Sequence, residues 1–168
     1  MKIQLLSLAA LTLCFATAAS AETVHQKANG DKAFASAGVS ALDKKLVEVK
    51  DEAKADDGKI TRIVGSTPQW GFVSYWFGIA APAGKSTIRF HIYVDADPIA
   101  DFGVYRLSPS GQEFLAKLKI PADAKPNTYV TVDVPVDAKE DWSGVALKKM
   151  VASDKPGPWI DTVSVVLP

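Results

Sequence analysis

The chain has 168 residues, with 19 Lys and Arg against 19 Asp and Glu, so its formal net charge is zero at pH 7. That length is enough for a single domain with a hydrophobic core of its own. A neutral chain offers no large basic surface, so the composition argues against binding to nucleic acid or to anionic lipid.

The first 21 residues follow the pattern of a secretory signal peptide. Lys2 provides a short positive region, a mostly apolar run follows, and Ala19-Ser20-Ala21 offers the small residues of a cleavage site. The single cysteine, Cys14, lies inside this segment, so the remaining chain cannot form a disulfide. We therefore expect a secreted or periplasmic protein that starts at Glu22 and has no membrane anchor after cleavage.

The stretch after the cleavage site predicts a leader followed by one domain. Residues 22–38 are polar, rich in alanine and without clear periodicity, and Ala33-Phe34 is a candidate first strand. The domain itself is expected to occupy residues 39–168, because no repeat and no low-complexity linker divides that part of the chain.

Residues 40–54 fit two kinds of secondary structure. Leu42, Leu46 and Val49 follow helical spacing, whereas residues 46–50 alternate between apolar and polar as a strand does. Because the rest of the chain has a β pattern, we favour a strand at residues 46–50, a turn at Asp56-Asp57-Gly58 and a second strand at residues 59–64. A short helix near residues 40–54 is the alternative.

Two long runs of aromatic and β-branched residues dominate the centre of the chain, at 72–79 and 86–94. Pro82 and Gly84 between them are typical turn residues, which predicts an antiparallel hairpin. Alternation places one apolar face of this hairpin against a core. The opposite face is expected to carry aromatic and polar side chains: Trp76, Arg89, His91 and Tyr93.

The rest of the chain alternates in short segments separated by turn residues, with strands expected at 102–107, 113–120, 129–136, 142–151 and 159–167. In the strand expected at 129–136, Pro135 cannot donate a ladder hydrogen bond, which indicates an edge strand or a strand end. Eight or nine short strands without a secure helix predict an all-β fold. The spacing of the turn residues fits a β-sandwich or a β-barrel.

Three stretches resemble strands of the galactose-binding-like jelly rolls: GFVSYWF at 71–77, PAGKSTIRF at 82–90 and PWIDTVSVV at 158–166. That group includes many carbohydrate-binding modules of secreted bacterial proteins. The resemblance implies a β-sandwich that binds sugars through loop or concave-face residues, often with a structural calcium ion.

The tryptophans are the strongest functional signal, because the apolar C–H faces of sugar rings stack on flat aromatic rings. Trp70 and Trp142 lie in polar loops and are expected to be exposed, and Trp76 lies on the outer face of the hairpin. Gln69 and Arg89 add planar polar groups. These five residues form the predicted ligand-binding set, and burial of the tryptophans in the core is the alternative.

Asp95, Asp97 and Asp101 are oxygen donors close together in the sequence, so they are the candidate calcium ligands. Their spacing is not that of an EF-hand, and a solvated loop is the alternative. The chain has no nucleophile elbow, no H-E-x-x-H and no phosphate-binding glycine loop. We therefore expect no enzyme, and no cofactor other than that calcium ion.

Two functions fit this sequence. The first is a secreted, non-catalytic module that binds carbohydrate through surface aromatic residues. The second is an extracellular or envelope module that binds a protein, because Trp, Tyr and Arg are also the preferred hot-spot residues of protein interfaces.

Overall fold

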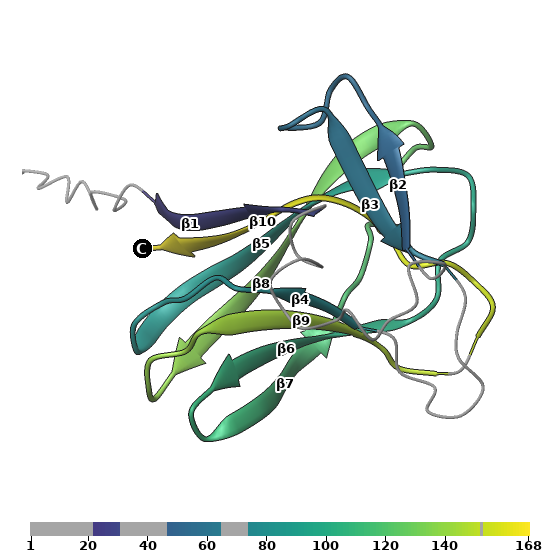
Figure 1. Ribbon diagram of the computed structural model, residues 1–168. Helices are drawn as coiled ribbons and strands as arrows, with labels where there is room; N and C mark the ends of the chain where they lie inside the picture. Colours follow the sequence, from purple (N-terminus) through teal and green to yellow (C-terminus); the bar gives the residue numbers. More distant parts are fainter. Residues whose placement is uncertain (1–21, 31–46, 65–73, 152) are drawn as a thin grey trace, which may run out of the picture.

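The computed structural model describes residues 22–30, 47–64, 74–151 and 153–168. These residues form ten strands in two antiparallel sheets that lie face to face (Figure 1). The strands are β1 (Thr23–Asn29), β2 (Val47–Asp51), β3 (Lys59–Ile63), β4 (Ser74–Phe77), β5 (Gly84–Val94), β6 (Phe102–Ser108), β7 (Gly111–Lys117), β8 (Thr128–Ala138), β9 (Gly144–Lys149) and β10 (Trp159–Leu167).

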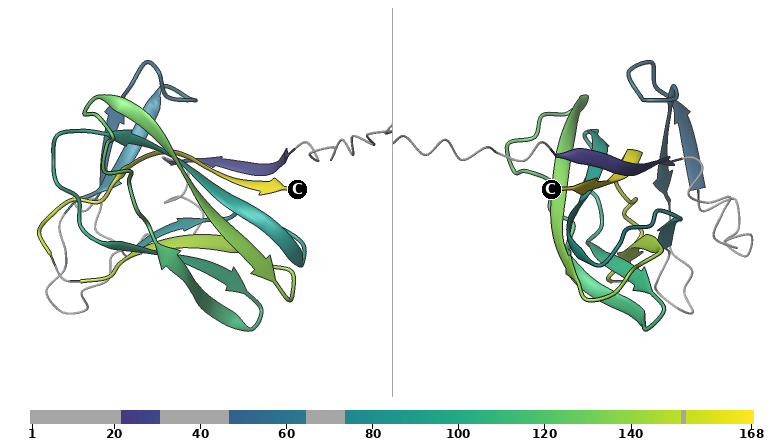
Figure 2. Two further views of the ribbon diagram at one scale, coloured as in Figure 1. Left: turned by 180° about the vertical axis from the view of Figure 1, so that it is seen from behind. Right: turned by 90° about the vertical axis from the view of Figure 1, so that its left-hand side faces the viewer.

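The larger sheet has the strand order β2-β3-β10-β5-β8, with β1 also paired to β10, and the smaller sheet has the order β4-β9-β6-β7. Figure 2 shows the two layers from behind and from the side. The prediction of an all-β sandwich is therefore confirmed. Within the described residues there is no helix long and apolar enough to span a membrane.

The core lies between the two sheets and follows the alternation of the strands. On β5, Ile88, Phe90 and Ile92 are fully buried, and they face Tyr75 and Phe77 from β4 across the sandwich. Burial of these large side chains supplies most of the driving force for folding. The predicted inner faces of both central runs are thus correct.

The predicted hairpin between those two runs is wrong. β4 pairs with β9 in the smaller sheet, whereas β5 pairs with β8 and β10 in the larger sheet. The turn between them contains Gly84, whose φ of 112° is accessible to glycine without strain. This turn carries the chain from one sheet to the other, so the two apolar faces meet from opposite sides of the core.

The N-terminal boundary of the domain also differs from the prediction. β1 pairs with β10 along its length, from Thr23 opposite Leu167 to Asn29 opposite Thr162. Residues 22–30 therefore belong to the sandwich and are not a separate leader. The candidate strand at Ala33-Phe34 lies outside the described residues.

The strand, turn and strand favoured near residues 46–64 are confirmed as β2 and β3. They pair in register from Val47 opposite Ile63 to Asp51 opposite Lys59. The helical alternative is wrong for residues 47–51, and residues 40–46 lie outside the described part of the chain. Likewise, β8 is an edge strand of the larger sheet, as Pro135 indicated.

Candidate functional site

The outer face of the smaller sheet carries aromatic side chains from three different strands. Directly paired residues of an antiparallel sheet point to the same face. Ala146 of β9 pairs with Trp76 of β4 and with Tyr105 of β6, and Tyr105 pairs with Phe114 of β7. Trp76, Tyr105 and Phe114 therefore lie in one line across the sheet, and we refer to them as the aromatic row.

Tyr105 and Phe114 are in ring contact, and one lysine lies near both Tyr105 and Trp76. The centroids of Tyr105 and Phe114 are 5.4 Å apart, at an interplanar angle of 64°. Lys148 Nζ lies 4.9 Å from the Tyr105 centroid and 5.4 Å from the Trp76 centroid. The order across the sheet is thus tryptophan, lysine, tyrosine and phenylalanine.

The three rings of the aromatic row are exposed to solvent to different degrees. Phe114 is 47% exposed, and it is the one aromatic residue among the exposed large hydrophobic residues of the described chain. Trp76 and Tyr105 are partly exposed, whereas Tyr75 beside Trp76 is fully buried. Exposed aromatic residues that gather on one sheet face are candidates for a binding surface.

Glycine makes room for the two rings at one end of the row. A Cβ atom placed on Gly103 would lie 2.9 Å from a ring carbon of Tyr105 and 3.1 Å from one of Phe114. Both rings therefore lie directly over the backbone of Gly103. The absence of a side chain there lets them keep this position.

Lys148 has a polar partner but no described counter-ion. Its ammonium donates a hydrogen bond to Gln112 Oε1, and no carboxylate of the described residues lies within ion-pair distance. Burial lowers the pKa of Lys148 below that of an ordinary lysine, because a partly desolvated ammonium is less stable.

Arg89 lies on the opposite side of the sandwich from Trp76. On the outer face of the larger sheet, its guanidinium contacts both carboxylate oxygens of Asp133, at 2.8 Å and 2.7 Å, and Glu22 at 3.1 Å. The hydrogen bonds that Arg89 donates to Asp133 raise the pKa of Arg89, so it stays charged. The structure does not bring Arg89 together with Trp76, and its donors already have acceptors.

His91 and Tyr93 also lie on the larger sheet, so the prediction that they flank Trp76 is wrong. Instead, Tyr93 packs with Ile60 and Trp159 in a small second core, against which Ala55 and Tyr129 pack. Trp159 is only 5% exposed. The ring faces of this second core are already covered by protein.

The expectation that Trp142 is exposed is wrong. Its side chain is 2% exposed and belongs to the main core, although polar residues flank it in the sequence. The cause is a pair of backbone hydrogen bonds of 3.0 Å between Trp142 and Ala81, which hold the segment against the sandwich. Gln69 and Trp70 lie outside the described residues and stay predictions.

The carboxylates proposed as calcium ligands do not gather into a metal site. Arg62 Nη1 lies 3.1 Å from Asp95 and 3.2 Å from Asp97, so a guanidinium occupies the position between them. Desolvation disfavours the charged form of Arg62, but the hydrogen bonds that Arg62 donates to Glu48 and Asp97 outweigh this effect and raise its pKa. Among the described residues, no three His, Cys, Asp or Glu side chains could hold a metal ion.

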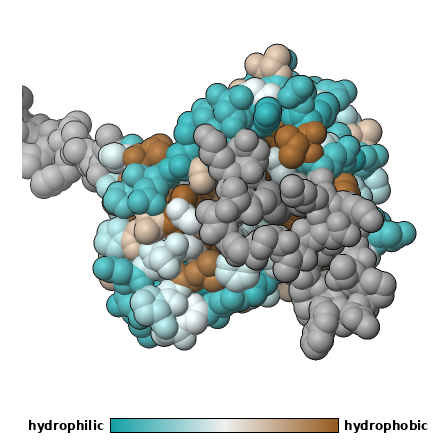
Figure 3. All heavy atoms as spheres, viewed as in Figure 1, coloured by the Kyte–Doolittle hydropathy of each residue, from teal (hydrophilic) through white to brown (hydrophobic). Residues whose placement is uncertain are grey.

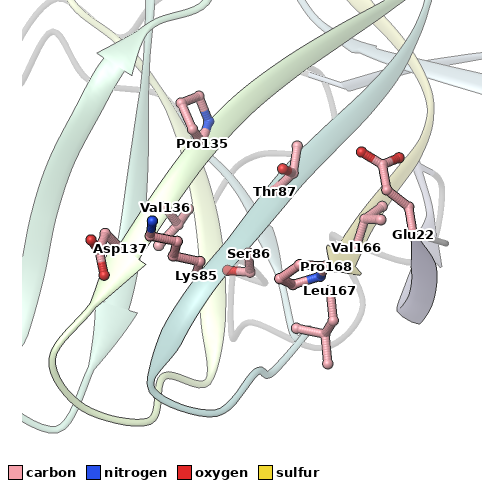
Figure 4. Close-up of a pocket in the computed structure, with 10 residues that line it drawn as sticks. All are labelled: Glu22, Lys85, Ser86, Thr87, Pro135, Val136, Asp137, Val166, Leu167 and Pro168. Carbon is pink, nitrogen blue, oxygen red and sulfur yellow. The ribbon is translucent and has the colours of Figure 1, made fainter. Parts of the chain in front are cut away.

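A hollow of about 690 Å³ lies on the larger sheet, near the ends of β5, β8 and β10 (Figure 4). Its lining is Glu22, Lys85, Ser86, Thr87, Pro135, Val136, Asp137, Val166, Leu167 and Pro168. None of these side chains is aromatic. The hollow therefore lacks the flat apolar surface on which a sugar ring stacks.

The view in Figure 3 shows a mostly hydrophilic surface with separate apolar patches over the part of the chain that is coloured. No single large apolar patch dominates that view. The case for a site therefore rests on the arrangement of particular side chains, and the aromatic row is the strongest such arrangement.

Sequence reasoning missed Tyr105, Phe114 and Lys148. Phe114 follows Gln112 and Glu113 directly, and an aromatic residue within such a polar run is a signal of exposure. The three residues come from β6, β7 and β9, and their adjacency follows only from the strand order of the smaller sheet.

Comparison with solved structures assigns the fold to a known class. The C-terminal CBM6 of LamC from Zobellia galactanivorans superposes with a TM-score of 0.53 at 15% identity, covering 84% of this chain and 98% of that one. A carbohydrate-binding module of Cellvibrio mixtus lichenase 5A, in complex with cellotriose, gives 0.51 at 12% identity over 87% and 99%. The CBM1 of BiXyn10A gives 0.51 at 11% identity over 86% and 99%.

The protein thus has the β-sandwich fold found in carbohydrate-binding modules, as the resemblance in its strands implied. No protein-family model and no curated protein matches the sequence. At this level of identity the similarity concerns the fold, so the function has to be argued from the site.

Proposed function

We propose that the protein is a secreted, non-catalytic module that binds a polysaccharide on the aromatic row. The observation that carries this proposal is the line of Trp76, Tyr105 and Phe114 on an open sheet face. Sugar rings present apolar C–H faces to aromatic rings, and such contacts need flat exposed surfaces.

The dimensions of the row suit a chain of sugars better than a single ring. β4 and β6 are separated by β9, so Trp76 and Tyr105 are about 10 Å apart at the usual spacing of strands. Phe114 extends the surface by one more strand. A linear glycan lying across the strands can therefore contact all three rings.

Export is the second part of the proposal and rests on the signal-peptide pattern of residues 1–21. β1 begins at Thr23, so cleavage after Ala21 leaves the strand complete. Mass spectrometry of the exported protein should show a chain that starts at Glu22. A chain that retains residues 1–21 would contradict this part of the proposal.

The binding proposal is tested by affinity electrophoresis and pull-down with a panel of soluble and insoluble polysaccharides. Trp76→Ala and Phe114→Ala should each weaken binding by about 1–3 kcal/mol, the range of interface hot spots. Val49→Ala is the control, because Val49 is similarly exposed but lies on β2 in the other sheet.

The same variants separate the competing explanations. Circular dichroism should show that Trp76→Ala and Phe114→Ala keep the fold and nearly all of the thermal stability. If no polysaccharide binds, the carbohydrate proposal fails, and a protein partner for the same face becomes the function to test.

A further inference from the structure

The charged residues on the outer face of the smaller sheet are all basic. Gly103 of β6 pairs with Lys148 on one side and with Lys117 on the other, so both lysines lie on the face of the aromatic row. The outward-facing positions set by strand pairing are Ser74, Trp76, Gly103, Tyr105, Leu107, Gln112, Phe114, Lys117, Gly144, Ala146 and Lys148. None of them is acidic.

This pattern differs from that of the larger sheet. There Arg62 pairs with Glu48 and Asp95, and Arg89 pairs with Asp133 and Glu22. Lys148 has no such carboxylate among the described residues, although it is partly buried between two rings. The aromatic rings compensate in part through cation–π attraction.

Lys148, at the centre of the row, is a partly desolvated cation with no counter-ion among the described residues, and such a charge is costly. An anion that arrives with the ligand would offset this cost through a charge-assisted hydrogen bond. Lys148 lies between Trp76 and Tyr105. The anion that pairs with it would therefore belong to the sugar that stacks on one of these rings, or to the next sugar of the chain.

Building on the proposed function, we infer that the polysaccharide bound by the aromatic row is anionic, with a carboxylate or sulfate group that pairs with Lys148. Lys117 supplies a second positive charge along the same line of the sheet. Stacking provides contact with the sugar rings, and the two lysines select chains that carry negative groups.

The test compares polymers that differ only in charge. Alginate is paired with its carboxyl-reduced form, and dextran sulfate is paired with dextran. Each is titrated against the wild-type protein and against Lys148→Met, Lys148→Arg and Lys85→Met. Lys85 is exposed on the opposite face of the sandwich, so Lys85→Met controls for general electrostatic attraction.

We expect at least one charged polymer to bind tenfold or more tightly than its neutral partner. Lys148→Met should remove about tenfold of that affinity, the effect of one hydrogen bond to a charged group. Lys148→Arg should retain most of it, and Lys85→Met should have no effect. A preference for alginate assigns a carboxylate, and a preference for dextran sulfate assigns a sulfate.

Two results would overturn the inference. Equal binding of charged and neutral partners, unaffected by Lys148→Met but weakened by Trp76→Ala, would leave the proposed function intact and exclude a role for charge. Equal losses in Lys148→Met and Lys85→Met would show general attraction to polyanions. Absence of binding to all four polymers, and to the wider panel, would overturn both proposals together.

Discussion

The outer faces of the two sheets each place a cation over a tryptophan ring, but they complete the arrangement differently. On the larger sheet, Arg62 Cζ lies 4.5 Å from the Trp159 centroid, and Asp95 accepts hydrogen bonds from both side chains. On the smaller sheet, Lys148 lies over Trp76 without a described carboxylate. We call the first pair closed, because a carboxylate of the same chain completes it, and the second pair open, because no carboxylate of the described residues does so.

Near the closed pair, further polar contacts hold the turn between β2 and β3 in place. The turn between β2 and β3 lies against the larger sheet, where Asp161 accepts a hydrogen bond of 3.0 Å from the backbone N–H of Asp56. The other carboxylate oxygen lies 2.6 Å from His91 Nδ1. The two regions thus differ in whether a described carboxylate accompanies the cation and in how far the tryptophan is covered.

The largest expected effect is the loss of stability in Trp159→Ala. Removal of a buried tryptophan from the second core should cost about 3–5 kcal/mol of the free energy of unfolding. The control is Trp76→Ala, whose partly exposed ring should cost much less. Urea denaturation measures the free energy of unfolding of both variants. Equal losses of stability would contradict the conclusion that Trp159 lies in a core and Trp76 does not.

Asp161→Ala should be the next largest effect. Asp161 is 1% exposed, and its loss leaves the Asp56 N–H and His91 without their partner, which should cost about 1–3 kcal/mol. Asp161→Asn keeps an acceptor for Asp56 and should cost less. Hydrogen exchange of residues 52–58 should accelerate in Asp161→Ala. Unchanged exchange would mean that the turn is held by packing alone.

Gly103→Ala should weaken binding without a comparable loss of stability. The new Cβ would displace the rings of Tyr105 and Phe114, which lie within 3.1 Å of its position. Loss of their alignment should cost about 1 kcal/mol of binding free energy. Calorimetry with the polysaccharide that binds wild-type protein measures the change, and unaltered affinity would remove Tyr105 and Phe114 from the site.

The smallest effect is expected for Arg89→Ala. Its pairs with Asp133 and Glu22 lie at the surface, where such pairs contribute less than about 1 kcal/mol to stability. Polysaccharide affinity should stay within about 0.5 kcal/mol of wild type, because Arg89 lies on the other sheet. A large loss of affinity would move the binding site to the larger sheet.

Alternation along single strands made the inner faces predictable. Ile88, Phe90 and Ile92 are separated by polar residues, and that period of two is enough to identify the side that is buried. Pro135 likewise indicated the edge strand, because a residue without an N–H cannot lie at the centre of a ladder. These inferences need only local chemistry.

Pairing between strands was not predictable in the same way. Pro82 and Gly84 indicate a turn, but their chemistry does not say whether the next strand returns to the same sheet or crosses to the other. The aromatic row depends on the strand order β4-β9-β6-β7, which brings together residues distant in the sequence. The prediction that Trp142 is exposed was wrong for a related reason, because the burial of Trp142 depends on a β-bridge to Ala81.

The position of β10 has a consequence for how the chain reaches its native state. β10 lies between β5 on one side and β1 and β3 on the other, and eight of its nine residues are buried. The larger sheet cannot close until residues 159–167 have been synthesised, because β1 and β5 have no other shared neighbour. Pairing of segments so distant in sequence is slow. We therefore expect the larger sheet to be completed late in folding, only after the C-terminal residues are available.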